Sequence, residues 1–315
     1  MQNADLSSVD LSGLKRGQWL QAVSDIGESR GFSEPLGKRH HAIFVEEGDT
    51  LLVTFETLPG IEALSETATP LGWDMVLRKG WSHLSVISSR DTWFRDGRVY
   101  GFFDALLDDG FFDDFERVIF FGAGPCGYAA AAYSVASPGA RVVMLQPQAT
   151  LDPRVTEWDE RFIDRRRLNF TSRYGYAPDM LDAAQQAYVL YDPRERLDAM
   201  HSALFERRNV SRFRLPFMGA ALQGDLLDMD LIAPLLELAA EDRLDTGSFA
   251  ALIRARRNYP PYLRKLLMKL EGEGRLGLAE MLCMNVTARL EAPRFRRRLE
   301  ALRAARKAPP PAPAE

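Results

Sequence analysis

The segment that most constrains the fold is VIFFGAGPCGYAAAA, residues 118–132. A run of β-branched and aromatic residues is typical of a buried strand, and the glycines that follow it lead into an alanine-rich stretch that favours a helix. Because glycine and alanine have very small side chains, this helix can lie close to the sheet. The segment therefore predicts a strand, a tight turn and a buried helix, and we expect any small-molecule site to lie around the turn.

Apolar runs elsewhere in the chain predict further elements. Strands are expected at residues 83–88, 117–121, 140–145, 187–192 and 210–216, and helices at 99–107, 127–136 and 197–205. Residues 41–56 contain two β-rich runs around Glu47, Gly48 and Asp49, which predicts a hairpin followed by a buried strand. Unbroken apolar strands that alternate with helices are typical of a parallel sheet covered on both faces. The predicted fold class is α/β, a mainly parallel sheet flanked by helices with a C-terminal helical extension.

The pattern also predicts a domain organisation. Residues 1–39 form a polar N-terminal lead-in, and residues 40–228 form the α/β domain, with a cap-like insertion at about 152–186. Residues 229–307 have a purely helical pattern, broken near 258–261 and near 292–293, and the proline-rich residues 308–315 predict a disordered tail.

The helical extension is basic. Residues 250–307 contain 15 Lys and Arg against 5 Asp and Glu, a net charge of +10, whereas the remaining residues carry −14. We expect this extension to complement the acidic part of the same chain, a second copy of the chain or another protein. It lacks the interleaved aromatic residues of single-strand binders, which argues against nucleic acid as the partner.

Composition excludes several other classes. With 46% apolar and 27% charged residues, the chain is typical of a globular protein. It has no apolar run of membrane-spanning length and no secretory signal pattern, so we expect a cytoplasmic location. Cys126 and Cys283 are too few for a disulfide framework, and four histidines without CxxC or HExxH spacing predict no metal site.

The turn at residues 122–127 is compatible with two kinds of site. Gly122, Gly124 and Gly127 have the G-x-G-x-x-G spacing of a dinucleotide-binding turn between a strand and a helix, which implies FAD or NAD(P) as the cofactor of an oxidoreductase. However, Gln146 stands at the end of the next strand, where such proteins have an acidic residue for the ribose.

The same turn resembles the nucleophile elbow of α/β-hydrolase-like proteins, with Gly122 and Cys126 as its small residues. GAGPCGYAA is similar to GSSMGGYAA in bacterial members linked to surface polysaccharides, and Gln146-Pro147-Gln148 is similar to their Ser-Pro-Gln run. The resemblance covers roughly residues 41–225, whereas the dinucleotide interpretation explains about 35 residues. We therefore favour an α/β-hydrolase-like fold, and no cofactor.

In this comparison the catalytic triad is incomplete. The triad acid is present as Asp192 or Asp198, but Gly124 occupies the nucleophile position and Ala220 the histidine position. Cys126 and His201 are alternative candidates for a nucleophile and a base, although a buried small residue and a structural histidine explain them better.

The sequence therefore predicts a degenerate elbow without hydrolase activity, in a protein that binds or scaffolds. A small anionic ligand is expected at the start of the elbow helix, held by the residues of the turn and of the next strand end: Gly122, Ala123, Gly124, Pro125, Cys126, Gly127 and Gln146.

The whole chain also resembles an uncharacterised alphaproteobacterial group often labelled phosphoadenosine phosphosulfate reductase. That enzyme class has a Ser-Gly-Gly-x-Asp-Ser phosphate loop and a Glu-Cys-Gly run, and this chain has neither. Cys283 lies instead in the helical pattern MLCMN. These residues do not support a reductase activity.

Overall fold

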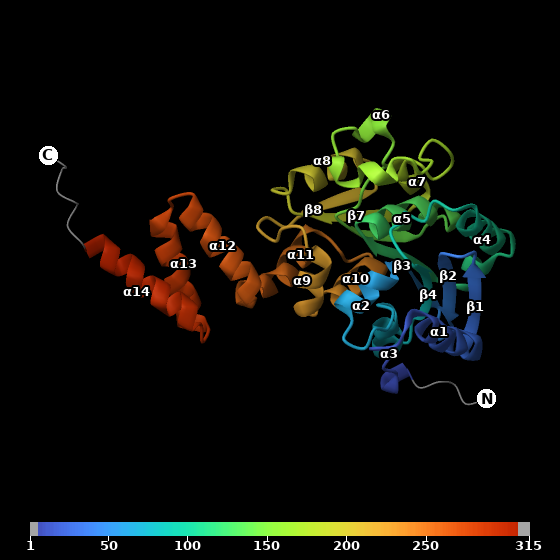
Figure 1. Ribbon diagram of the computed structural model, residues 1–315, viewed down its shortest axis with the longest axis horizontal. Helices are drawn as coiled ribbons and strands as arrows, with labels where there is room; N and C mark the ends of the chain where they lie inside the picture. The colour runs from blue at the N-terminus through green and yellow to red at the C-terminus, as the bar shows by residue number, and fades with distance from the viewer. Residues whose placement is uncertain (1–5, 308–315) are drawn as a thin grey trace. The chain divides into compact units, whose positions relative to one another are not determined.

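The computed structural model describes residues 6–307, and the chain divides into two compact units, Met1–Ala250 and Ala251–Glu315. The first unit is an α/β unit and the second is helical (Figure 1). The expected boundary at residue 228 thus lies inside the first unit. The tail expected at 308–315 lies outside the described residues.

One eight-stranded sheet forms the centre of the α/β unit, with strand order β1-β2-β4-β3-β5-β6-β7-β8. Strand β2 is antiparallel to its neighbours β1 and β4, and every other neighbouring pair is parallel. A mainly parallel sheet with a reversed second strand and this order is the α/β-hydrolase-like arrangement, so the predicted fold class is confirmed. The strands are β1 (Gly31–Leu36), β2 (His40–Val45), β3 (Thr50–Thr57), β4 (Ser82–Ser88), β5 (Arg117–Ala123), β6 (Arg141–Leu145), β7 (Gln186–Tyr191) and β8 (Val210–Arg214).

The hairpin predicted for residues 41–56 is wrong. Strands β2 and β3 do not pair with each other, because β4 lies between them and pairs with both. The hydroxyl of Ser82, at the start of β4, accepts hydrogen bonds from the backbone N–H groups of Glu47 and Gly48 at 2.9 and 3.1 Å. The polar turn is thus held by β4, a strand from further along the chain. Turn-forming residues indicate a turn but do not indicate which distant strand contacts it.

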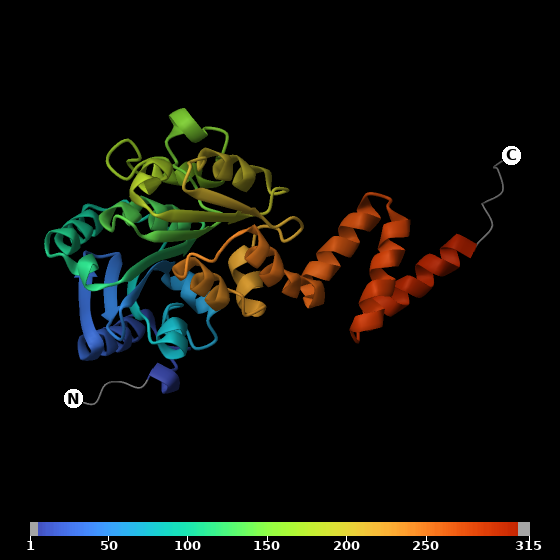
Figure 2. The same cartoon turned by 180° about the vertical axis from the view of Figure 1, so that it is seen from behind.

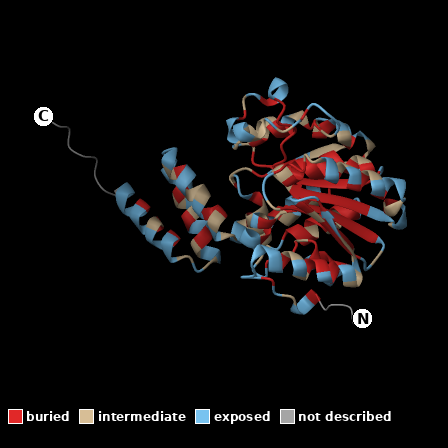
Figure 3. Ribbon diagram, turned by 45° about the vertical axis from the view of Figure 1, so that its right-hand side comes forward, coloured by how far each residue is buried: buried red, intermediate tan, exposed pale blue. Residues whose placement is uncertain are grey.

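Helices cover both faces of the sheet, and the strands are buried between them (Figures 2 and 3). Successive side chains of β2 show the two faces, since Ala42 and Phe44 join one apolar cluster and Ile43 and Val45 join the other. The helices of the unit are α1 (Arg16–Arg30), α2 (Leu58–Leu64), α3 (Trp73–Lys79), α4 (Gly97–Asp108), α5 (Pro125–Tyr133), α6 (Pro153–Thr156), α7 (Ala177–Met180), α8 (Arg196–Leu204), α9 (Leu222–Asp228), α10 (Ile232–Ala240) and α11 (Thr246–Leu252, which extends across the unit boundary).

The N-terminal region is part of this architecture. Residues 16–36 form α1 and the edge strand β1, although residues 1–39 were expected to be a lead-in. Trp19 of α1 is only 1% exposed, and its indole N–H donates a hydrogen bond to the Ala68 carbonyl at 2.8 Å. This segment therefore closes the apolar core on one face of the sheet.

The second unit contains α12 (Pro260–Gly272), α13 (Leu276–Arg289) and α14 (Pro293–Lys307). The predicted helix breaks near 258–261 and 292–293 are confirmed, because α12 and α14 begin at prolines. Leu270, Cys283 and Leu302 are among its buried side chains. Throughout residues 6–307, no helix combines the length and apolar character needed to cross a membrane.

We expect Trp19→Ala to lower the free energy of unfolding by about 3–5 kcal/mol, because it leaves a large cavity and an unpaired carbonyl. Urea denaturation followed by circular dichroism measures this change. Gln21→Ala, on the exposed side of the same helix, is the matched control and should change stability by less than about 0.5 kcal/mol. Equal effects of the two substitutions would show that α1 is not part of the core.

Candidate functional site

The turn between β5 and α5 has the backbone geometry of a sharp strand-to-helix reversal. Gly124 has φ 54° and ψ −122°, a region that favours glycine, and its N–H donates to the Leu145 carbonyl at 2.8 Å. A Cβ atom built on Gly124 would meet nothing within 4 Å. The turn thus leaves open space at the residue that the sequence comparison aligns with a hydrolase nucleophile.

A close approach of two backbone segments fixes the residue type at Gly122. A Cβ atom there would lie 2.2 Å from the carbonyl oxygen of Cys126, which is far inside contact distance. The first turn of α5 therefore crosses directly over the end of β5. This contact is the physical reason for a glycine at the first position of the motif.

A cavity of about 830 Å³ lies beside this turn, at the carboxyl edge of the sheet. Of the residues expected to bind a ligand, Ala123, Pro125 and Cys126 line it, whereas Gly122, Gly124, Gly127 and Gln146 are not among its lining residues. The other walls come from the end of β3, the segment through α2 and α3, Asp91, and residues 223–233. In open α/β sheets this edge is the usual location of a ligand site.

Glu56, at the end of β3, is the buried ionisable residue of this cavity, and sequence reasoning missed it. It is only 9% exposed, and its carboxylate accepts hydrogen bonds from the Thr54 hydroxyl at 2.9 Å and from the Leu71 N–H at 3.1 and 3.3 Å. Burial raises the pKa of Glu56 to about 6, although these hydrogen bonds oppose the rise. The signal in the sequence was an acidic residue that ends an otherwise buried strand.

A second buried polar residue stands behind Glu56. The Nε2 of His83 lies 2.8 Å from the Thr54 hydroxyl, which donates in turn to Glu56. Burial lowers the pKa of His83 to about 3, so the ring is neutral at physiological pH. Since the Thr54 hydrogen points at the carboxylate, the His83 ring donates from Nε2, and the three side chains form one directed chain of hydrogen bonds.

Cys126 lines the cavity but is poorly suited to be a nucleophile. Burial raises the pKa of its thiol well above the ordinary value, and the nearby carboxylates of Glu56 and Asp91 raise it further. A thiolate is the reactive form of cysteine, and this environment disfavours it. The side chain therefore acts as a compact buried residue under the turn.

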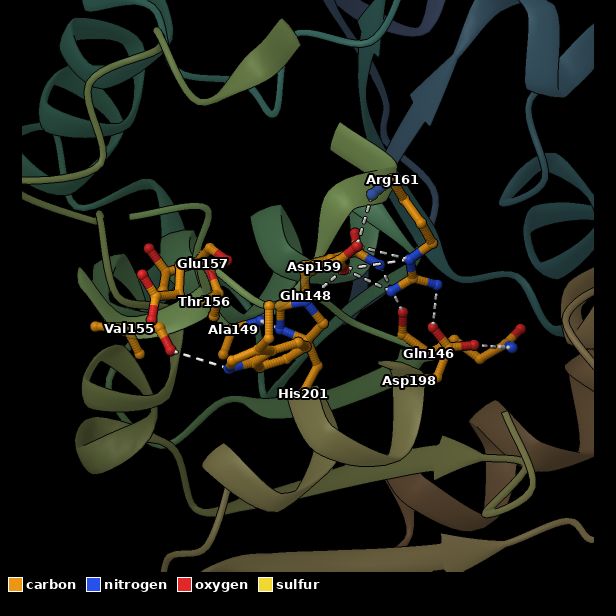
Figure 4. A network of polar contacts seen from close by, with 12 residues as sticks. Gln146, Gln148, Ala149, Val155, Thr156, Glu157, Asp159, Arg161, Asp198 and His201 are labelled. Carbon is orange, nitrogen blue, oxygen red and sulfur yellow. Dashed lines mark hydrogen bonds and ion pairs between the residues drawn. The ribbon is translucent and has the colours of Figure 1, made fainter. Parts of the chain in front are cut away.

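His201, the alternative base, is fully engaged elsewhere (Figure 4). Its Nδ1 accepts the Ala149 N–H at 3.1 Å, and its Nε2 lies 2.9 Å from the carboxylate of Asp159 in the cap-like insertion. A ring that accepts at Nδ1 carries its proton at Nε2, so His201 donates to Asp159. Its side chain has no exposed surface, and it is not among the residues that line the cavity.

Gln146 and Asp198 belong to the same polar network, shown in Figure 4. The Gln146 amide donates to Asp198 at 2.7 Å, and the other carboxylate oxygen of Asp198 accepts from Arg161 at 2.6 Å. Arg161 also pairs with Asp159 at 2.8 Å. Although burial favours a higher pKa, hydrogen bonds from His201 and Arg161 hold the pKa of Asp159 well below its ordinary value. The network ties residues 159–161 of the insertion to the strand end and to α8.

Asp192, the other candidate acid, holds the loop after β8. Its carboxylate accepts the Gly219 N–H at 2.7 Å and the Arg194 N–H at 2.9 Å. Gln146 supports the same loop, because it accepts the Leu222 N–H at 3.2 Å. Ala220, the residue at the expected histidine position, lies between these two anchors. The candidate triad positions are thus brought to one edge of the sheet, where they serve as structural contacts.

Comparisons with protein-family models found no match, and neither did a comparison with curated proteins. Solved structures with similar folds include the capsule O-acetyltransferase of Neisseria meningitidis serogroup A, at 10% identity and a TM-score of 0.38, over 58% of this chain and 86% of that chain. Est1E from Butyrivibrio proteoclasticus has 13% identity and a TM-score of 0.40, over 63% and 93%. A lipase-esterase related protein from Clostridium acetobutylicum has 12% identity and a TM-score of 0.40, over 64% and 99%. The fold assignment rests on the order and direction of the strands. The activities of these proteins are not assigned to this chain.

We expect the stability of the protein to depend on pH through Glu56. Because its pKa is raised in the folded state, the folded protein binds this proton more tightly than the unfolded chain, so stability decreases as the pH rises from about 4.5 to about 6. Glu56→Gln removes this effect. The difference in free energy of unfolding between the variant and the wild type should therefore be about 2 kcal/mol more favourable to the variant at pH 7.5 than at pH 4.

Urea denaturation at the two pH values measures this difference. The matched control is Glu62→Gln, an exposed residue of α2 that is not among the cavity-lining residues. If Glu56→Gln shifted stability equally at both pH values, Glu56 would not be a buried group with a raised pKa.

Proposed function

We propose that this chain is a catalytically degenerate α/β-hydrolase-like protein that binds a small molecule in the cavity beside the β5–α5 turn. The observation that carries the proposal is Gly124: the turn has a sharp reversal and open space at this position, and the residue has no side chain to attack a substrate. The cavity at the same strand end gives a ligand room to bind.

The missing base supports the same proposal. The loop after β8 holds Ala220 where the hydrolase comparison expects a histidine, and no histidine follows His201 in the sequence. His201 itself donates to Asp159 and accepts from a backbone N–H, so both ring nitrogens are occupied. A serine-hydrolase reaction needs both a nucleophile and a proton acceptor, and neither is available in this arrangement.

The alternative activities gain no support from the fold. The dinucleotide-binding fold has strand order 3-2-1-4-5-6, with its glycine turn after the first strand. Here the strand order of the sheet is different, and the glycine turn follows β5. The Gln146 amide donates hydrogen bonds to Asp198 and, at 3.3 Å, to the Gly219 carbonyl. Nothing in the site favours an FAD- or NAD(P)-dependent oxidoreductase or a phosphoadenosine phosphosulfate reductase.

A fluorophosphonate probe tests the absence of hydrolase chemistry. We expect no covalent labelling of the purified chain, because no activated serine lies at the turn. An active serine esterase treated in parallel confirms that the probe works. Specific labelling of a single serine, abolished by its substitution with alanine, would overturn the proposed loss of activity.

We also propose self-association through the second unit. Helix α13 buries Ala279, Cys283 and Val286 on one side, whereas Leu278, Met281 and Met284 are 46%, 65% and 45% exposed. Large exposed apolar side chains on one helix favour a protein contact. The net charge of +10 on residues 250–307 complements the −14 of the remaining residues, which favours an acidic surface on a second copy as the partner.

Analytical ultracentrifugation tests this second proposal. We expect an oligomer at about 50 mM salt that dissociates at about 500 mM, because the attraction between opposite charges is screened. Met281→Glu together with Met284→Glu should give monomers at both salt concentrations. The control is Leu107→Glu, an equally exposed apolar residue of the α/β unit, which should leave the oligomer intact. A monomeric wild type at low salt would overturn the proposal.

A further inference from the structure

The charges around the cavity are strongly one-sided. Six of its lining residues are acidic, and Arg78 is the one basic residue among the described residues that line it. The acidic residues come from β3, from the segments around α2 and α3, from the loop after β4 and from the end of α9: Glu56, Glu66, Asp74, Asp91, Asp228 and Asp230. Arg78 pairs with Asp74 at 2.8 Å and with Asp230 at 2.9 Å, so its charge is already shared by two of them. A small anion is therefore disfavoured, although the turn alone favours one.

Glu56 gives the cavity a buried negative charge, and among residues 6–307 no cationic side chain forms an ion pair with it. Its hydrogen-bond partners are the Leu71 N–H and the hydroxyls of Thr54 and Ser85, all of them neutral. His83, behind Thr54, is neutral as well. A carboxylate removed from water is costly when it is not paired, and a bound cation would offset that cost.

The remaining lining explains what kind of cation fits. Ile61, Leu71, Met75 and Ile232 are apolar residues of the lining, and they alternate with hydroxyl and amide residues such as Thr57, Ser65 and Gln223. The carboxylates of Glu66 and Asp91, which also line the cavity, are exposed. Apolar walls suit a hydrocarbon chain, whereas a small hydrated metal ion would gain nothing from them. Acidic residues both inside the cavity and at exposed positions suit a molecule with a positive group at each end.

The geometry points to an aliphatic diamine or polyamine as the ligand of this cavity, with one ammonium group paired to Glu56 and the chain along the apolar wall. This inference rests on the proposed function, since it assigns the ligand class of the same cavity. The second ammonium group lies among the exposed carboxylates. Binding involves no covalent step.

Isothermal titration calorimetry of the full chain with 1,5-diaminopentane tests the inference, with 1,5-pentanediol and glutarate as uncharged and anionic analogues of the same length. At pH 7.5 and low salt, we expect the diamine to bind at least about 10-fold more tightly than either analogue. Glu56→Gln should weaken diamine binding by about 10-fold or more, whereas the control Glu62→Gln should not change it.

The pH dependence gives a second readout. Thr54 and Ser85 contact Glu56 directly, and His83 lies behind Thr54. The other titratable or charged side chains that line the same cavity are Glu66, Asp74, Arg78, Asp91, Cys126, Asp228 and Asp230. Because protonation of Glu56 removes the charge that pairs with the ligand, diamine affinity should fall by about 10-fold per pH unit once the pH is well below 6. In Glu56→Gln this decrease should be absent.

The titrations test the diamine inference, and the fluorophosphonate probe tests the proposed loss of activity. Equal or tighter binding of the diol or of glutarate, or diamine binding unchanged by Glu56→Gln, would overturn the diamine inference and leave the proposed binding function standing. If none of the three compounds bound at about 10 mM, the inference would also be overturned. Labelling by the fluorophosphonate probe would overturn the proposed loss of activity, whatever the titrations show.

Discussion

The contact between the end of β5 and the first turn of α5 is the constraint on which the α/β unit depends. Gly122 allows the backbone of Cys126 to cross at a distance that no side chain could tolerate. Ala129, Ala130, Ala131 and Ala132 then have no exposed surface, so α5 lies buried against the middle of the sheet. The position of this helix defines the turn at Gly124, and the turn forms one wall of the cavity.

A second set of interactions holds the candidate acids and the alternative base in contacts with the surrounding backbone and side chains. A hydrolase would hold its acid and position its histidine near the ends of the strands. The residues found there are Gln146 and Asp192, which follow β6 and β7, and Asp198 and His201 of α8. Here they bind the insertion through Asp159 and Arg161, and they hold the loop after β8 through backbone N–H groups. Gln146, Asp198, Arg161, Asp159 and His201 are joined to one another by hydrogen bonds and ion pairs, which satisfy these buried and half-buried polar groups.

The site shows how far the sequence alone could lead. The strand, turn and buried helix at residues 118–132 were predicted correctly, because strand, glycine and alanine patterns act locally. Glu56 was missed since its significance depends on three segments far apart in sequence, which bring Leu71, Asp91 and Cys126 to one cavity. The hairpin at 41–56 was predicted wrongly for the same reason, since β4 is inserted between two strands that are neighbours in sequence. Local patterns cannot state which distant strand pairs with which.

The sequence by itself determined the α/β class, most strand and helix positions and the breaks in the helical extension. It also places Gly124 and Ala220 where the resemblance to hydrolases expects a nucleophile and a histidine. These features depend on residue type and spacing, which the chain carries directly. Only the tertiary structure decided that residues 16–36 complete the sheet, that His201 is held by Asp159, and that the cavity beside the turn is acidic. Burial and charge are properties of groups brought together by folding, and an isolated carboxyl such as that of Glu56 acquires its raised pKa only when the fold removes it from water.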